Sequence, residues 1–143
     1  MKFSIITVCF NSAATIRDAV NSVLAQQGVD LEFIVIDGQS TDDTVQILKR
    51  YGDRITHLVS EPDQGIYDAM NKGVALATGD VVGILNSDDF YADHFVLAEV
   101  MAAFVDESVD CVYGDLDYVA VEDTDQVVRD WRSGPYRPGL FAR

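Results

Sequence analysis

Two patterns of hydrophobic and polar positions take turns along the first 104 residues of the chain. Continuous apolar runs rich in β-branched residues are typical of buried strands, and four such runs occur. Between them, apolar residues recur every three or four positions, as they do on one face of a helix, and several of these segments end near a glycine. The pattern predicts strands at 3–10, 31–37, 54–60 and 81–85, and helices at 12–27, 42–51, 66–77 and 97–104.

The regular alternation of strands and helices determines the expected architecture. Parallel strands need crossover connections, which helices usually provide, so the pattern indicates an α/β fold with a mostly parallel sheet and helices on both faces. After residue 108 the rhythm changes to strand-like runs separated by turn-forming residues, at 110–114, 116–121 and 126–131. We expect a single domain overall, with an α/β half at 1–108 and an incomplete second half at 109–143.

Composition and charge narrow the functional classes. The 143 residues include 24 Asp and Glu against 10 Lys and Arg, which gives a formal net charge of −14. Such a surface repels nucleic acid and anionic lipid, so we expect no nucleic-acid partner. No apolar run reaches the ~18 residues of a membrane span. The first run contains Ser4 and Thr7 and lacks the cleavage site of a signal peptide, so the sequence indicates the cytoplasm.

The sequence lacks the motifs of several common metal, redox and catalytic sites. Cys9 and Cys111 have no partner at C-x-x-C spacing, and we expect reduced, buried core thiols. His57 and His94 lie far apart and are expected on a strand and on the surface rather than on a metal. There is no G-x-x-x-x-G-K-[ST] loop, no G-x-G-x-x-G after the first strand and no Gly-x-Ser-x-Gly elbow. These absences argue against P-loop hydrolysis, ordinary dinucleotide binding and acyl transfer.

Acidic residues gather where the expected strands end. Open parallel sheets bind ligands at the carboxyl ends of their strands. Those ends are residues 7–11, 37–38, 61–63 and 86–89. Carboxylates are suited to Mg²⁺ or Mn²⁺ and also accept hydrogen bonds from sugar hydroxyls. A divalent ion held by Asp89 would let an anionic diphosphate approach this acidic edge.

Simpler roles stay open for these acids. Asp88 and Asp89 would also suit the N-terminus of the following helix, where acids complement the helix dipole. Asp37 would also serve as a turn residue before Gly38.

Four stretches of sequence resemble the nucleotide-binding half of family 2 glycosyltransferases, which are inverting enzymes of the GT-A fold. They are "SIITVCFNSAATIRDAVNSVLAQ", "EFIVIDGQSTDDT", "SEPDQGIYDAMNKGVALATGD" and "GILNSDD". They span residues 3 to about 90 in the order and spacing of the family. The third stretch is similar to the branch that builds bacterial surface and capsular polysaccharides. The resemblance implies that 1–108 is the nucleotide-sugar-binding half and that 109–143 begins the acceptor-side half.

The resemblance also implies a role for each matching position. Asp37 would hydrogen-bond the base, Asp63 would lie near the base or the ribose, and Asp88 would accept from the ribose. Asp89 would coordinate Mn²⁺ or Mg²⁺. Lys72 would reach a phosphate, with a solvated lysine as the alternative. The complete nucleotide-binding set is Thr7, Val8, Cys9, Phe10, Asn11, Asp37, Asp63, Lys72 and Asp88.

Two positions depart from the family pattern. The family often has Asp-x-Asp-Asp after the fourth strand, whereas this sequence has Asn86 at the first position. A metal or ribose role is lost there, while the metal role of Asp89 remains. Gly38 replaces the second Asp that commonly follows the second strand, which leaves Asp37 as the only strong acceptor on that turn.

The catalytic base is expected beyond Arg143. Inverting transfer requires a general base that deprotonates the acceptor hydroxyl, and in the family this acid lies well downstream of the metal motif. Because the sequence ends in a Pro/Gly-rich segment, we expect a fragment that binds nucleotide-sugar weakly and catalyses poorly. Asp115 and Asp117 are the nearest internal candidates for the base, and their alternative is a turn and an exposed strand face.

The leading hypothesis is a metal-dependent, inverting glycosyltransferase of cell-surface polysaccharide synthesis. Its donor would be a UDP- or GDP-linked sugar and its acceptor a glycan or lipid-linked molecule. Peripheral association with the inner face of the cell membrane and a homodimer stay open. The alternatives are a non-catalytic nucleotide-sugar-binding module and a receiver-type phosphoacceptor domain. The receiver domain requires an acid pair directly after the first strand, where this sequence has "CFNSA".

Overall fold

The computed structural model describes residues 1–135 and divides the chain into two compact units. The first unit is Met1–Ala102, and the second begins at Ala103. The functional division expected after residue 108 stays a prediction.

The first unit contains a four-stranded sheet in the order β3-β2-β1-β4. All three pairings are parallel, as predicted. The strands are β1 (Lys2–Cys9), β2 (Asp30–Asp37), β3 (His57–Ser60) and β4 (Val81–Ile84). The helices are α1 (Ile16–Leu24), α2 (Thr44–Lys49), the 3₁₀ helix η1 (Gly52–Arg54), α3 (Ile66–Leu76) and α4 (Val96–Ala103).

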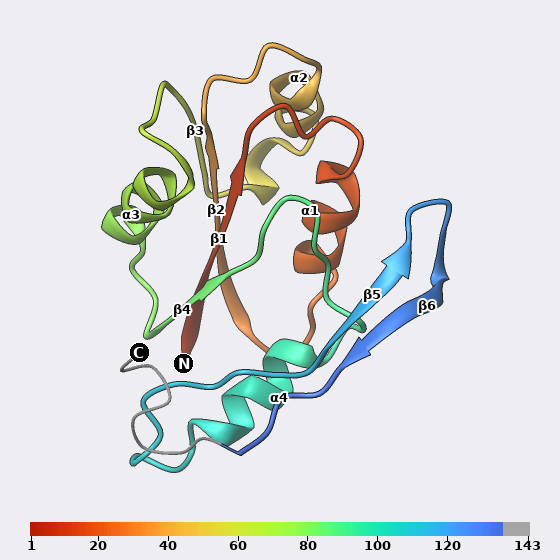
Figure 1. Ribbon diagram of the computed structural model, residues 1–143. Coiled ribbons are helices and arrows are strands. Elements are labelled where there is room, and N and C mark those ends of the chain that lie inside the picture. Colours follow the sequence, from red (N-terminus) through yellow and green to blue (C-terminus); the bar gives the residue numbers. More distant parts are fainter. Residues whose placement is uncertain (136–143) are drawn as a thin grey trace. The chain divides into compact units, whose positions relative to one another are not determined.

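Helices cover both faces of this sheet, with α3 on one side and α1 and α2 on the other (Figure 1). Alternate residues of β1 and β2 therefore enter two separate cores. The larger core, on the α1 side, includes Phe3, Ile5, Phe33 and Val35. The core on the α3 side is built from Ile6, Val8, Ile34, Ile36 and Ala69. Burial on both faces explains why these strands read as continuous apolar runs, and the expected α/β architecture is confirmed.

Helix α3 packs unusually close to β1. A Cβ atom added at Gly73 would lie 2.5 Å from Cγ2 of Ile6, well inside the normal contact distance. Gly73 is buried, so the missing side chain is what allows this helix to approach the sheet.

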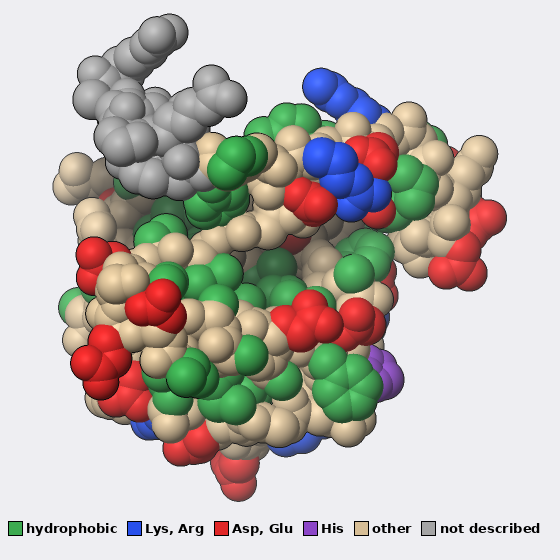
Figure 2. All heavy atoms as spheres, turned by 90° about the horizontal axis from the view of Figure 1, so that it is seen from below, with side chains coloured by type: hydrophobic (Ala, Val, Ile, Leu, Met, Phe, Trp, Pro, Cys, Tyr) green, Lys and Arg blue, Asp and Glu red, His purple; other side chains and the backbone are tan. Residues whose placement is uncertain are grey.

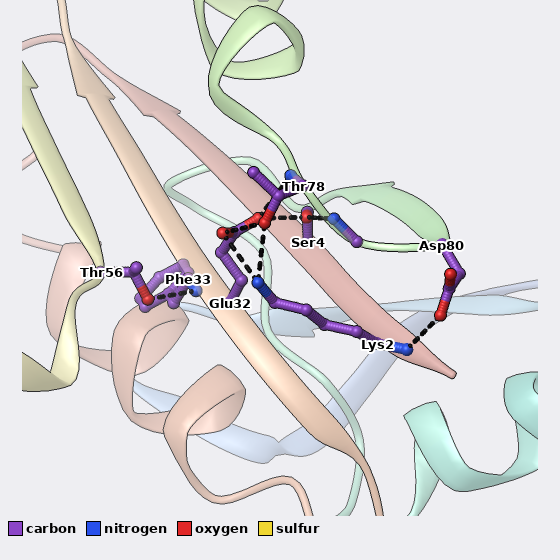
Figure 3. Close-up of polar contacts among 8 residues, drawn as sticks. Lys2, Ser4, Glu32, Phe33, Thr56, Thr78 and Asp80 are labelled. Atoms are coloured by element: carbon purple, nitrogen blue, oxygen red, sulfur yellow. Dashed lines mark hydrogen bonds and ion pairs between the residues drawn. The ribbon is translucent and has the colours of Figure 1, made fainter.

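A buried carboxylate ties the strands together at the amino end of the sheet (Figure 3). Glu32 on β2 is only 3% exposed and accepts hydrogen bonds from the hydroxyls of Ser4 (2.5 Å) and Thr78 (2.7 Å). The ammonium of Lys2 lies 3.0 Å from Oε1 of Glu32. These contacts join β1, β2 and the α3–β4 loop. They also lower the pKa of Glu32 to about 2, the Ser4 hydrogen bond contributing most.

The second unit contains a two-stranded antiparallel sheet, β5 (Leu116–Ala120) and β6 (Asp123–Trp131). The prediction of a further strand at 110–114 is wrong, because this segment is irregular and pairs with no strand. Cys111 within it is exposed, contrary to the expectation of a buried thiol, whereas Cys9 is buried as expected.

Surface properties agree with the composition. Acidic side chains are spread over the face that Figure 2 presents, where Lys and Arg side chains are few, in accordance with the net charge of −14. Within residues 1–135, no helix is both long and apolar enough to cross a membrane.

Candidate functional site

The loops that follow the four parallel strands leave the sheet at one edge (Figure 1). The strand register sets this arrangement, since Cys9 at the end of β1 is paired with Asp37, and Asp37 with Ser60. On the other side of β1, the amide of Leu85 donates to the carbonyl of Ile6 at 3.0 Å, which continues the β4 pairing. The structure thus brings the expected carboxyl-end segments together.

Asp37 points into the interior of the protein. It is fully buried, and its Oδ2 accepts hydrogen bonds from the backbone N–H of Ser40 (3.0 Å) and the hydroxyl of Ser60 (2.6 Å). Its Oδ1 accepts from the Ser40 hydroxyl and lies 3.7 Å from Sγ of Cys9. Burial, and then the negative charge of Asp37, raise the pKa of the Cys9 thiol. From the interior of the protein, Asp37 therefore connects the carboxyl ends of β1, β2 and β3.

Small polar side chains fasten the loop after β1 to the loop after β2. Asn11 has a positive φ of 51°, and its Oδ1 accepts from the backbone N–H of Thr41 at 2.9 Å. Asp42 accepts from the backbone N–H of Ala13 at 3.0 Å and from the Thr44 hydroxyl at 2.5 Å. These contacts lower the pKa of Asp42, the Thr44 hydrogen bond having the largest effect. The sequence interpretation missed this fastening, although "FNSA" and "QSTDDT" carry the residues that form such local turns.

Asp63 occupies the space beside Gly38. Its Oδ1 accepts from the backbone N–H of Gly65 at 2.8 Å, and its Oδ2 lies 2.5 Å from where a Cβ of residue 38 would be. The loop that carries Asp63 is held by Lys72 on α3, whose Nζ lies 2.9 Å from Oε1 of Glu61 and donates to the carbonyl of Pro62 at 2.7 Å. The hydrogen bond to Glu61 is the main reason that the pKa of Lys72 is raised.

Asp88 and Asp89 lie exposed in a turn directly after β4. The Asn86 side-chain amide donates to Oδ2 of Asp89 at 3.2 Å, while Oδ1 of Asn86 is buried and has no partner among the described residues. The hydroxyls of Ser12 and Ser87 lie 2.9 Å apart and connect this turn to the loop after β1. Helix α4 begins only at Val96, so Asp88 and Asp89 do not lie at its N-terminus, as the alternative interpretation expected.

The remaining residues of the expected nucleotide-binding set are divided between core and surface. Thr7, Val8 and Cys9 are buried in the sheet, and the Thr7 hydroxyl has no hydrogen-bond partner among the described residues. Phe10, at 61% exposure, and Asn11 reach the surface at the edge.

In the second unit, Asp115 and Asp117 belong to an exposed network around Arg132. Asp115 accepts from the backbone N–H (2.8 Å) and hydroxyl (2.7 Å) of Ser133, which lowers its pKa. Arg132 lies 3.4 Å from Asp115, 3.5 Å from Asp117 and 2.7 Å from Asp130. A carboxylate whose charged form is stabilised in this way is a weaker proton acceptor.

The side chains of the β4 turn suit a divalent cation that is bound partly by the protein and partly by the phosphates of a substrate. Across the described part of the chain, no three His, Cys, Asp or Glu side chains lie close enough to hold a metal by themselves. Mg²⁺ is commonly bound by one or two carboxylates together with substrate phosphates and water. Asp89, exposed in this turn and held through Oδ2 by the Asn86 amide, supplies a carboxylate of this kind.

Comparisons with known proteins agree on the class of protein. A sequence model of "Glycosyl transferase family 2" matches residues 4–142. A "PGL/p-HBAD biosynthesis glycosyltransferase" of Mycobacterium bovis is 41% identical over 120 residues, which covers 80% of this chain and 46% of that protein. An uncharacterized glycosyltransferase of Mycobacterium tuberculosis is 42% identical over 101 residues, or 70% of this chain and 38% of its own length. The chain thus spans less than half of the length of these relatives.

Solved structures with the same fold carry nucleotide sugars. The crystal structure of S. aureus TarS 1–349 in complex with UDP-GlcNAc matches with a TM-score of 0.66 and 33% identity, covering 75% of this chain and 32% of TarS. The mannosyltransferase PcManGT from Pyrobaculum calidifontis, in complex with GDP-Man and Mn²⁺, matches with a TM-score of 0.68 over 82% of this chain and 35% of its own. At 24% identity, the second match supports the fold alone.

Proposed function

Because the chain belongs to glycosyl transferase family 2, we propose that its sheet edge binds a nucleoside-diphosphate sugar whose sugar is transferred, with inversion, to a glycan or lipid-linked acceptor. Its fold is the mostly parallel, Rossmann-like sheet of the GT-A enzymes that it resembles. The observation that carries the proposal is the position of Asp88 and Asp89. They are exposed beside Ser87, whose hydroxyl contacts that of Ser12 in the loop after β1.

The proposed donor lies across the sheet edge, with its diphosphate at the β4 turn. Asp89, supported by Asn86, would hold Mn²⁺ or Mg²⁺, and Asp88 would accept hydrogen bonds from the ribose. When bound, such an ion neutralises charge on the diphosphate leaving group. The nucleotide sugar bound by TarS supports the donor assignment by analogy.

The loops after β1, β2 and β3 would form the nucleoside side of the site. Phe10 and Asn11 are exposed there, and Asp63 is partly exposed beside Gly38. Thr7, Val8, Cys9 and Asp37 lie beneath and would support these loops rather than touch the base. Lys72 holds the β3–α3 loop through Glu61 and Pro62.

We do not assign the general base to a described residue. Asp115 and Asp117 are engaged by Arg132, and Ser133 stabilises the charged form of Asp115. We propose that residues 1–108 bind the donor, that the chain from 109 onward starts the acceptor side, and that the base lies beyond Arg143.

The role in the cell is proposed from the relatives. One of them is named for PGL/p-HBAD biosynthesis. We propose synthesis of a surface polysaccharide or glycolipid on the cytoplasmic side of the cell membrane, with peripheral association. Fractionation of cells that express the tagged whole protein tests this location, and recovery outside the cytoplasm and the membrane fraction would contradict it.

Calorimetric titration tests donor binding. Purified protein is titrated with UDP, GDP and dTDP, each with and without Mn²⁺. We expect at least one of them to bind, more tightly with Mn²⁺, and Asp89→Asn to lower the Mn²⁺-dependent affinity about tenfold or more because a charged ligand is lost. Asp53→Asn removes an exposed acid from η1, at the other end of β3, and is the matched control. Absence of binding to all three nucleotides by the wild-type protein would overturn the proposal.

A further inference from the structure

Strand β4 forms one edge of the parallel sheet and has a free side. Among the described strands it pairs with β1 alone, so the backbone N–H and C=O groups on its outer side have no sheet partner. Its segment 81–85, "VVGIL", contains no charged residue and no proline, which are the features that usually keep edge strands from pairing with other chains. The backbone of β4 is therefore open to a further strand.

Val82 and Ile84 add an exposed apolar surface to this edge. They are in register with Ser4 and Ile6 of β1, and Ile6 belongs to the core on the α3 side of the sheet. Because paired residues point to the same face, both β4 side chains lie on the α3 side as well. They are nonetheless 44% and 47% exposed, respectively. Helix α3 thus leaves the β4 end of this face uncovered.

The flank of α3 that is directed toward β4 is apolar too. Gly73 lies against Ile6, and successive helix residues are rotated by about 100°, so Lys72 and Val74 lie on opposite flanks of the helix. Lys72 contacts Glu61 directly after β3, which places its flank on the β3 side. Val74 therefore lies on the β4 side, where it is half-exposed and adds to the apolar surface of the edge strand.

The other strand edges are better protected against pairing. At the opposite edge of the parallel sheet, β3 exposes only the polar Ser60. The hairpin strands carry charged side chains along their length, among them Asp117, Asp125 and Arg129. Charges on an edge strand oppose its pairing with another chain. Among the described strands, β4 is the one whose edge favours a partner.

A second copy of β4 matches this edge. Antiparallel pairing around a two-fold axis at Gly83 sets Val82 of one copy opposite Ile84 of the second copy, and the reverse. Cross-strand pairs of β-branched side chains stabilise a sheet, and this register forms two of them on the exposed face. The remaining pairs in the same register bring no like charges together: Val81 with Leu85, and Asp80 with Asn86.

We infer that β4 is a self-association surface, at which a second copy of this chain pairs edge to edge and joins the two sheets into one. This inference does not depend on the proposed function. Because the strands run antiparallel, the loops after the two β4 strands lie at opposite ends of the joined sheet. We expect a weak dimer, with a Kd on the order of 0.1 mM, since one short strand buries less than the ~1,200 Å² of a standard interface.

Sedimentation velocity of the 143-residue chain at increasing concentration tests the pairing. We expect the average mass to rise from that of one chain toward that of two. The net charge of −14 on each copy opposes association, so raising the ionic strength to ~1 M should strengthen it.

A charge placed on the edge should weaken the dimer. We expect Val82→Lys to raise the Kd about tenfold or more. Val128→Lys makes the same change at an exposed position of β6 and is the matched control, which should associate as the wild type does. Both positions are exposed in the single chain, and thermal unfolding verifies that each variant is folded.

Disulfide trapping tests the register independently. In a Cys111→Ser background, chains with Val82→Cys are mixed with chains with Ile84→Cys under mild oxidation, and the products are identified by mass. Only residues 82 and 84 of different copies face each other in the proposed pairing, so we expect the mixed disulfide to exceed both symmetric ones.

Three results would overturn the inference. The first is a chain that stays monomeric at every concentration and ionic strength, in which case a different partner covers β4. The second is a Val82→Lys variant that associates as the wild type does, or is weakened no more than Val128→Lys. The third is a mixed disulfide that does not exceed the symmetric ones. A mass that rises with concentration, together with selective weakening by Val82→Lys, supports it.

Discussion

Glu32 on β2 accepts hydrogen bonds from both the backbone N–H and the hydroxyl of Thr78, at 2.8 and 2.7 Å, across 46 positions of sequence. The carboxylate thereby fastens the α3–β4 loop to the amino end of the sheet, away from the candidate site. We expect Glu32→Gln to lower the free energy of unfolding by about 1–3 kcal/mol, because the neutral amide cannot accept all the hydrogen bonds that the buried carboxylate accepts. Urea unfolding measures the change. Glu99→Gln, on an exposed position of α4, is the control and should have little effect.

The same carboxylate makes stability depend on pH. The pKa of Glu32 is lowered from 4.5 to about 2 by its hydrogen bonds to Ser4 and Thr78. Since the folded protein binds this proton less readily than the unfolded chain, the stabilisation is complete above pH ~4.5 and is lost as the pH falls toward 2. Urea unfolding at several pH values should show that the loss on acidification is smaller in Glu32→Gln. An identical pH dependence in the two proteins would contradict the assignment.

Thr7 contributes an unpaired hydroxyl to the interior of the sheet. The residue is fully buried, and its Oγ1 has no partner in the described chain. Replacing Thr7 by Val keeps the shape and removes the cost of the unpaired group, so we expect the free energy of unfolding to rise by about 1 kcal/mol. Thr7→Ser keeps the hydroxyl and loses the methyl group, and should destabilise instead. A destabilising Thr7→Val would show that the hydroxyl is paired in solution.

Gly73→Ala tests the close approach of α3 to β1. Alanine is favoured over glycine within a helix by about 1 kcal/mol. Here the added methyl group would lie 2.5 Å from Ile6, and we expect a net loss of stability of about 1–3 kcal/mol from overpacking. The exposed Ala75→Gly on the same helix should cost only about 1 kcal/mol. A stabilising Gly73→Ala would mean that the helix can shift without cost.

Lys72→Met distinguishes a phosphate contact from a loop anchor. The ammonium contacts Glu61 and the carbonyl of Pro62, so we expect the affinities for uridine and UDP to fall by the same small factor, about 2–5. Lys49→Met removes the same charge from an exposed position of α2 and is the control. A loss for UDP that clearly exceeds the loss for uridine would instead place Lys72 on the diphosphate.

The sequence predicted the centre of the sheet well because β1 and β2 are buried on both faces. Continuous apolar runs such as 31–37 have few other interpretations, and the glycines between elements marked their ends. The third strand was predicted to begin at Arg54, but Gly52–Arg54 forms a 3₁₀ helix and β3 begins at His57. The apolar pattern of "RITHLVS" continues through this turn because Ile55 is buried in the core without belonging to the strand.

The direction of individual acidic side chains was harder to predict. Asp37 and Asp89 both follow apolar strands in the sequence, yet Asp37 is fully buried and Asp89 is exposed. The difference depends on Ser40 and Ser60, which come from two other segments and meet only in the folded protein. The contact between Asp63 and Gly38, 25 positions apart, is also a product of the fold.

The buried thiol of Cys9 offers a built-in reporter for this edge of the protein. Burial and the neighbouring Asp37 keep the sulfur protonated, and alkylating reagents attack only an accessible thiolate. Its labelling rate in a Cys111→Ser background therefore measures how often the ends of β1 and β2 open, and the exposed Cys111 of the unaltered chain supplies the reference for an unprotected thiol. A ligand bound over the ends of these strands would slow this labelling, whatever its identity.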